Sequence, residues 1–210
     1  MIKTIITFIR HGETEWNRSG KQQGHQNSNL TSRGIRQAEM IGKFLDTKSY
    51  DLIYSSDLKR ALHTAQLINE QLNILLIKNK NLRERKLGIM EGLTRDEFKT
   101  QYPHEFKLFT SDIDYIIPQG ESSRQFYQRT VSAVDEIADA HPGKKILVVT
   151  HGGNLSCIFR KVFDIPLDKK RNFSLLNTSL NTFEINNRQW KLISWGNAIH
   201  LENNDPVDDF

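Results

Sequence analysis

Short apolar runs alternate along the chain with longer segments in which apolar residues recur every three or four positions. The runs have the length and composition of buried β-strands and span residues 2–9, 50–56, 74–77 and 145–150. The periodic segments predict α-helices over residues 30–46, 57–72, 121–140 and 154–163. Strands that alternate with helices predict an α/β fold, with a mostly parallel sheet covered by helices on both faces.

The end of the chain departs from this alternation. Residues 179–194 predict two strands around an Asn186-Asn187 turn, which would add antiparallel strands at the edge of the sheet. No internal repeat, low-complexity segment or linker interrupts the pattern. We therefore expect one domain over residues 1–210, with an acidic and flexible tail at 201–210.

Two of the predicted strands lead into the same dipeptide. His11-Gly12 follows the first strand, and His151-Gly152 follows the last strand of the parallel set. The carboxyl ends of parallel strands meet at one edge of a sheet, where α/β proteins bind ligands. Gly152 and Gly153 also open a helix, and the N–H groups at a helix start favour an anion. The sequence therefore predicts two imidazoles at one anion pocket.

Composition narrows the classes of function. A single cysteine, Cys157, excludes an internal disulfide and cannot by itself build a thiolate metal cluster. Apolar runs are too short to cross a bilayer, and the N-terminus lacks a secretory pattern, so we expect a cytoplasmic protein without membrane partners. The net charge of +4 suits an anionic ligand. The basic residues are dispersed, which disfavours a nucleic-acid surface.

Several kinds of chemistry could use two histidines at a pocket. Zinc would need three or four ligands, and no nearby Cys or carboxylate has a ligand spacing. A serine hydrolase would need an elbow such as Gly-x-Ser-x-Gly, which the chain lacks. A neutral imidazole can instead attack phosphorus, and arginines would bind the phosphate oxygens. Arg10 adjoins one histidine, and Arg60 lies in the first turn of a predicted helix.

Six ordered blocks carry a resemblance to a known family. They read RHGETEWN, GHQNSNLTSRGIRQA, YSSDLKRALHTA, LRERKLGIMEG, PQGES and VTHGG, and they spread from Ile5 to about Gly153. Together they resemble the histidine phosphatase superfamily, which includes the phosphoglycerate mutases, and within it the small bacterial-type phosphatases. The resemblance implies a three-layer α/β/α sandwich that works without a metal or another cofactor.

The resemblance also implies roles for individual residues. His11 would be the nucleophile that becomes phosphohistidine, and Glu84 would be the general acid. Arg10, Arg60 and His151 would bind the phosphate beside His11. Further contacts to phosphate or substrate are expected from Asn17, Gln23, Gly24, Gly152 and His200, the last on the substrate side of the pocket.

Some of these charged residues also have a possible structural role. Arg60 could form an ordinary helix pair with Asp57, and we favour phosphate binding instead. Glu91, close to Glu84 in the same block, is interpreted as structural.

The segment over residues 79–120 is the least regular, and the region from Arg85 to Ser123 is expected to cover the pocket mouth. A short helix is predicted after Thr94, where Glu97 can complete a capping box. A mixed lining of cations and aromatics is expected from Lys86, Arg95, Tyr102, Phe106, Phe109 and Tyr115.

The expected function is hydrolysis of a small phosphorylated metabolite through phosphohistidine, without a metal. A phosphoglycerate mutase with the same nucleophile and a non-catalytic phospho-ligand-binding relative remain alternatives, and a homodimer stays open. Hydrolysis is favoured over the mutase because only about 25 residues separate LRERKLGIMEG from PQGES and the chain stops soon after His200. The resemblance implies that the phosphoglycerate mutases close their pocket partly with a longer segment after the general acid and with extra C-terminal chain.

Overall fold

A six-stranded sheet forms the centre of the computed structural model, which describes residues 3–201. The strand order is β3-β2-β4-β1-β5-β6. The strands are β1 (Thr4–Arg10), β2 (Leu52–Ser55), β3 (Leu75–Lys78), β4 (Lys145–Thr150), β5 (Leu180–Asn186) and β6 (Gln189–Asn197). The first four are parallel to one another, and β5 and β6 join in antiparallel pairing. The predicted mixed sheet is confirmed.

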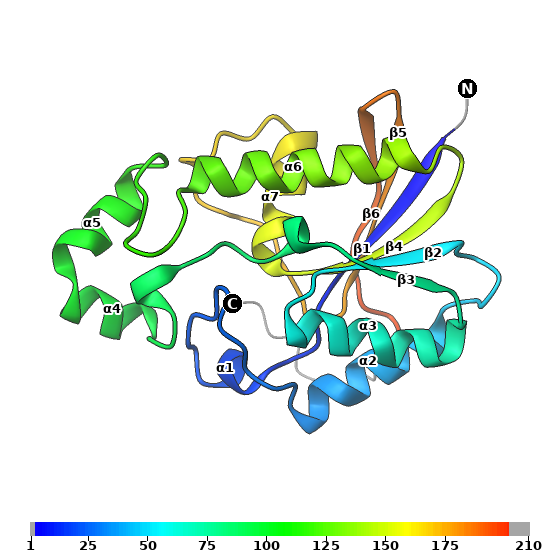
Figure 1. Cartoon of the computed structure of the whole chain (residues 1–210), viewed down its shortest axis with the longest axis horizontal. Helices are drawn as coiled ribbons and strands as arrows, with labels where there is room; N and C mark the ends of the chain where they lie inside the picture. Colours follow the sequence, from blue (N-terminus) through cyan, green and yellow to red (C-terminus); the bar gives the residue numbers. More distant parts are fainter. Residues whose placement is uncertain (1–2, 202–210) are drawn as a thin grey trace.

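Helices cover both faces of this sheet. On one face lie α2 (Ser32–Phe44) and α3 (Lys59–Leu72), and on the other lie α6 (Ser123–Ala140) and α7 (Gly152–Val162) (Figure 1). Each pair is joined to the sheet by its own hydrophobic cluster. The three-layer α/β/α sandwich is therefore confirmed.

Strand β4 shows why the parallel strands read as continuous apolar runs. Ile146 and Val148 are buried in the cluster below α6 and α7, whereas Leu147 and Val149 are buried in the cluster below α2 and α3. Successive side chains of a strand point to opposite faces, so a strand covered on both sides needs apolar residues at every position. Each such side chain contributes about 1.5–3 kcal/mol of transfer free energy.

Helix boundaries follow local capping. Helix α6 begins at Ser123 because Ser122 and Gln125 form a capping box, slightly later than predicted. Helix α7 begins at Gly152, two residues before the predicted start, with His151 as its N-cap. Two consecutive glycines have low helix propensity, which hid this first turn from the periodicity.

The hairpin of β5 and β6 turns one residue later than predicted. Asn186 pairs with Gln189, which leaves Asn187 and Arg188 as the two turn residues. Both have positive φ, at 49° and 60°. A two-residue turn with positive φ at both central positions matches the right-handed twist of the strands, so this pairing is preferred over an Asn186-Asn187 turn.

A small helical unit projects to one side of the sandwich (Figure 1). It contains α4 (Arg95–Gln101), which begins with the predicted capping box of Thr94 and Glu97, and α5 (Pro103–Ser111), which the sequence pattern did not predict. Short elements complete the chain: α1 (Glu15–Arg18) and the 3-10 turns η1 (Lys80–Leu82) and η2 (Gly88–Met90).

The predicted acidic tail lies almost entirely outside the described residues, which end at Leu201. Between residues 3 and 201, no helix has both the length and the apolar character needed to cross a bilayer.

Candidate active site

The pairing of β1 with β4 brings the two predicted histidines together. Arg10 is in register with Thr150, and the His11 N–H donates to the Thr150 carbonyl at 2.9 Å. The next residue on each strand is therefore a histidine at the same edge of the sheet. The His11 and His151 rings lie with their centroids 5.2 Å apart, and both side chains are buried.

The hydrogen bonds of His11 define its tautomer. Nδ1 lies 2.8 Å from the Gly12 carbonyl oxygen, which can only accept, so Nδ1 carries the proton. Nε2 then presents its lone pair and accepts a hydrogen bond from Nε of Arg60 at 3.3 Å. Burial and the charges of Arg60 and Arg10 hold the pKa of His11 well below its usual value. The imidazole is neutral and nucleophilic at physiological pH.

His151 lies behind His11, at the start of α7. Its Nε2 is 2.8 Å from Oγ of Ser56, and burial together with the neighbouring charge of Arg60 holds its pKa well below the usual value. Nδ1 of His151 is buried without a hydrogen-bond partner among the described residues.

Arg60 is a buried cation beside this nitrogen. Its side chain is 1% exposed, and its two Nη groups donate to the carbonyls of Gln26 and Gly24 at 2.9 and 2.8 Å. Burial lowers its pKa to about 10, so it stays charged. Asp57 pairs with Arg83 instead, which excludes the ordinary helix pair between Asp57 and Arg60.

Arg10 reaches the same cavity from the end of β1. Its Nη1 donates to the carbonyl of Leu175, on the loop before β5. Gly152 meets it at the start of α7, where a Cβ would lie 3.5 Å from Nε of Arg10.

The loop after β1 supplies three further predicted residues. Asn17 accepts from the Thr14 N–H through Oδ1 at 3.1 Å and closes the capping box of α1. Gln23 donates to Oγ1 of Thr14 at 2.8 Å, and its buried Oε1 has no described partner. Gly24 has a φ of 51°, and a Cβ there would overlap the Glu91 carboxylate. All three predicted residues, Asn17, Gln23 and Gly24, line the cavity.

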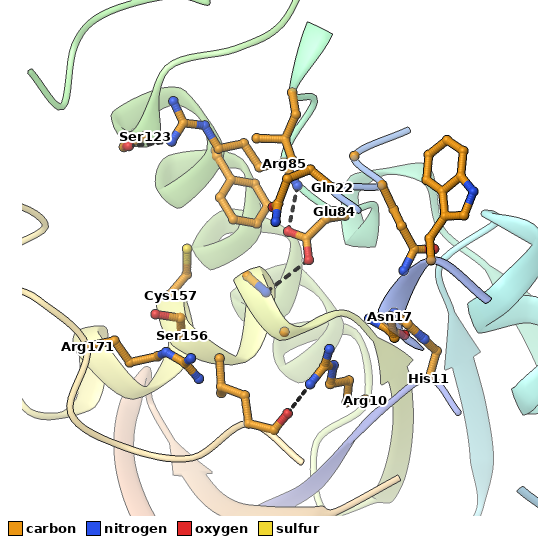
Figure 2. Close-up of a pocket in the computed structure, with 18 of the residues that line it drawn as sticks. Arg10, His11, Asn17, Gln22, Glu84, Arg85, Ser123, Ser156, Cys157 and Arg171 are labelled. Atoms are coloured by element: carbon orange, nitrogen blue, oxygen red, sulfur yellow. Dashed lines mark hydrogen bonds between the residues drawn. The ribbon is translucent and has the colours of Figure 1, made fainter. Parts of the chain in front are cut away.

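Glu84 enters the cavity from above the start of α7 (Figure 2). Its Oε1 accepts from the Arg85 N–H at 2.8 Å, and its Oε2 accepts from the Gly153 N–H at 3.0 Å. A Cβ on Gly153 would lie 2.0 Å from Oε1 of Glu84. The missing side chain of Gly153 therefore makes room for this carboxylate.

Glu91 has the structural position expected for it. Its carboxylate accepts from the backbone N–H groups of His25, Gln26 and Leu87 at 2.9, 3.1 and 3.0 Å. These bonds join the loop that carries Gly24 to the segment that carries Glu84.

The predicted aromatic lining is wrong. The cavity, of about 570 Å³, is lined by Arg95 but not by Lys86, Tyr102, Phe106, Phe109 or Tyr115. Phe106, Phe109 and Tyr115 pack instead around Phe98 and Ile117 in a separate hydrophobic cluster. Burying these rings against one another is more favourable than exposing them at a polar cavity mouth.

A family model described as the histidine phosphatase superfamily, branch 1, matches residues 6–198. The chain belongs to this superfamily. The predicted family and its class of enzyme, a phosphomonoesterase, are thereby confirmed.

Known relatives of this histidine phosphatase match nearly the whole chain. Phosphoglycerate mutase-like protein 4 of Arabidopsis thaliana is 38% identical over 203 residues, covering 94% of this chain and 86% of its own. A metal-independent phosphoserine phosphatase of the same plant is 36% identical over 202 residues, covering 94% and 83%. The structure of a mutant phosphoserine phosphatase from Entamoeba histolytica with phosphoserine matches at a TM-score of 0.83 and 30% identity, covering 95% and 100%.

Sequence reasoning missed several residues that hold the site of this histidine phosphatase. Thr64 Oγ1 accepts from the Gly12 N–H at 3.0 Å, and Asn177 donates to the His11 carbonyl at 2.7 Å. Ser56 and Gly153 contact His151 and Glu84 as described. Small polar residues of this kind have no distinctive spacing. Gly153 alone gave a signal, as the second glycine of a strand-to-helix turn.

No group of three or more His, Cys, Asp or Glu side chains within residues 3–201 is arranged to hold a metal ion. Metal independence remains a prediction.

His200 does not lie where the family resemblance implied. It is absent from the cavity lining, and its Nε2 is 3.3 Å from Oγ1 of Thr178, whose N–H donates to the Arg10 carbonyl. Phe44, at the end of α2, lies beside its ring. The position expected on the substrate side is therefore corrected to one behind β1, because the chain after β6 crosses toward α2.

This position predicts an effect on stability. Burial lowers the pKa of His200 to about 4, whereas an unfolded histidine titrates near 6.5. As the pH falls between these values, the unfolded state binds a proton that the folded state does not, so His200 reduces the free energy of unfolding by up to about 1.4 kcal/mol per pH unit. When the pH is lowered from about 7 to 5, the free energy of unfolding measured with urea should therefore fall less for His200→Gln than for the wild-type protein.

The exposed His63 provides the matched control, and His63→Gln should keep the wild-type dependence on pH. A His200→Gln protein with the wild-type dependence and a raised KM would instead return His200 to the substrate side.

Proposed function

We propose that this protein hydrolyses a small phosphomonoester through a phosphohistidine on His11, without a metal ion. The observation that supports this most directly is the tautomer of His11. Its Nε2 lone pair lies at the cavity, next to the guanidinium of Arg60, while Nδ1–H is fixed on the Gly12 carbonyl. A neutral imidazole held beside buried cations is arranged to attack an electrophilic phosphorus.

In the first step, the bond from Nε2 of His11 to phosphorus forms as the ester P–O bond breaks. The electron pair of that bond goes to the leaving oxygen, which takes a proton from Glu84. Glu84 reaches the cavity from the side opposite the strand that carries His11 (Figure 2), so acid and nucleophile can act on opposite ends of the breaking bond.

Charge on the transferred phosphoryl group is stabilised by groups fixed before the substrate arrives. Arg10 and Arg60 supply guanidinium donors, and the positive end of the α7 dipole lies at the same cavity, which Gly152 and Gly153 line. His151 is not among the residues that line the cavity, but its ring lies beside the His11 ring, with centroids 5.2 Å apart. Because these donors already neutralise the phosphoryl oxygens, the reaction needs no metal, as the name of the phosphoserine phosphatase from Arabidopsis thaliana states for that relative.

In the second step, water attacks phosphorus while the carboxylate of Glu84 takes a proton from it. The Nε2–P bond breaks and its electron pair returns to His11, which releases inorganic phosphate and restores the enzyme. The same carboxylate thus serves as acid and then as base.

Phosphatase activity is favoured over mutase activity by the small unit of α4 and α5. Its aromatic residues pack on one another, and the unit projects to one side of the sandwich (Figure 1), so that Arg95 alone of the residues in α4 and α5 lines the cavity. A mutase must exclude water from its phosphoenzyme, which needs a closed pocket. Water should reach phosphorylated His11 here.

The nucleophile is tested by trapping the phosphoenzyme. Acid-quenched wild type should carry a phosphate that is base-stable and acid-labile, and His11→Ala should carry none and release no phosphate from p-nitrophenyl phosphate, all in the presence of EDTA. His151→Ala keeps the attacking nitrogen, so it should turn over slowly yet still become labelled. Near-normal activity of His11→Ala, or complete loss with EDTA that zinc or magnesium restores, would contradict the proposal.

The acid is tested through the leaving group. Glu84→Gln should reduce hydrolysis of an alkyl phosphate by about 100-fold or more and that of p-nitrophenyl phosphate far less, because a phenolate leaves without a proton. Gly153→Ala should show the same pattern, since its methyl group would occupy the position of Oε1 of Glu84. Gly152→Ala is the control, because a Cβ at this position makes only ordinary van der Waals contacts. This variant should lose much less activity than Gly153→Ala. Equal damage to both substrates would point to phosphate binding instead of acid catalysis.

Hydrolase and mutase are separated by following 3-phosphoglycerate with and without 2,3-bisphosphoglycerate. We expect phosphate release without efficient isomerisation in the wild-type protein. Rapid interconversion with little phosphate released would identify a mutase. Inactivity on both counts would exclude this substrate only.

A further inference from the structure

The cavity around His11 carries more positive charge than one phosphate requires. Its described lining residues include a single carboxylate, Glu84, and a much larger set of cations: Arg10, Lys21, Arg60, Arg85, Arg95, Arg160 and Arg171. Arg10 and Arg60 lie beside His11 and suffice for a phosphoryl group. The remaining cations favour a substrate that carries further negative charge away from its phosphate.

The residues of helix α7 that line the cavity indicate how far from the phosphate the additional negative charge of the substrate would lie. Gly152, Gly153, Ser156 and Cys157 all line the cavity, which places them on one face of the helix. Gly152 adjoins Arg10 at the phosphate end, and Ser156 follows one turn later. Four residues at 1.5 Å each put Ser156 about 6 Å further along the cavity.

Arg171 approaches this second position from the loop between α7 and β5. Its side chain extends toward the side of the cavity where Arg10 lies, with Ser156 next to it (Figure 2). Both polar side chains therefore border the same end of the cavity, one helical turn from the phosphate.

The loop that carries Arg171 is anchored to α7 on both sides. Before it, the buried Arg160 of α7 donates to the carbonyls of Pro166 and Lys169. After it, the ring of Phe173 stacks on Phe159 of α7 with centroids 4.1 Å apart. Because both anchors are on the helix that carries Ser156, the position of Arg171 relative to Ser156 is built into the fold.

Hydrogen bonds also hold the cations near this end of the cavity in place, and Nη1 of Arg171 itself donates to the Phe173 carbonyl at 3.3 Å. Arg160 uses its Nη groups on the loop carbonyls, and Arg85 donates to the Glu121 carbonyl and to Ser123. Burial raises the pKa of the Cys157 thiol, which keeps it neutral.

We propose that Arg171 and Ser156 bind a carboxylate that the substrate carries next to its phosphate. A guanidinium fork and one hydroxyl match the two oxygens of a carboxylate, whereas a second phosphate would call for more donors. The spacing of about 6 Å suits a phosphate ester of a short hydroxy acid. This inference rests on the proposed function, since it uses the phosphate position at His11.

The test compares two inhibitors of p-nitrophenyl phosphate hydrolysis that differ in the carboxylate alone. 3-Phosphoglycerate should have an inhibition constant at least about 10-fold lower than glycerol 3-phosphate in the wild-type protein, the contribution of one charge-assisted pair. Arg171→Gln should raise the inhibition constant of 3-phosphoglycerate by about 10- to 100-fold and that of glycerol 3-phosphate by less than about 3-fold. Ser156→Ala, a small change on a helix, should lower the same preference by a smaller factor.

The matched control is Lys170→Gln, which removes a positive charge from the neighbouring, exposed position and should leave the preference unchanged. Equal inhibition by the two compounds in wild type, or an equal loss in Arg171→Gln and Lys170→Gln, would overturn the carboxylate site. Both inhibition measurements require that the protein hydrolyses p-nitrophenyl phosphate through a phosphorylated His11. If the proposed function fails, this hydrolysis or the phosphate label on His11 will be absent, which distinguishes that failure from a failure of the carboxylate site.

Discussion

The parallel pairing of β1 with β4 is the constraint on which the site depends. One register, with Arg10 opposite Thr150, places His11 and His151 on adjacent strand ends. A slip of one residue would turn every side chain of a strand to the other face and would break both hydrophobic layers at once. The hydrophobic cores on the two sides of the sheet therefore fix the positions of the two imidazoles relative to each other.

Burial of positive charge is the second feature that shapes the site. A buried guanidinium is costly unless hydrogen bonds replace its water, and Arg60 obtains them from the carbonyls of Gln26 and Gly24. The loop that supplies those carbonyls is held in turn by Glu91. The site is thus prepared for an anion before one arrives, and the loss of stability is offset by the surrounding packing.

The sequence predicted the order and type of the main elements because strands buried on both faces and amphipathic helices leave strong patterns. Arg10, His11 and Arg60 were predicted because they stand beside strand ends and helix starts, whereas the position of Glu84 came from family resemblance. The sequence did not predict the roles of Ser56 and Asn177, nor the space that Gly153 leaves for the Glu84 carboxylate. Their partners lie 95, 166 and 69 residues away, and no local pattern encodes such contacts.

The small unit of α4 and α5 has its own hydrophobic cluster around Phe98, separate from the two cores of the sandwich. Changes in distant, separately packed regions usually have additive effects on stability. The unit can therefore accumulate substitutions, or be exchanged for a segment of another length, without disturbing the strand ends that carry the reacting groups. Its ties to the cavity include Arg95 of α4, which lines the cavity, and the guanidinium of Arg85, 4.4 Å from the ring centroid of Phe109. The packing of this unit and the chemistry at the strand ends can accordingly diverge at different rates, and a designer could alter one while keeping the other.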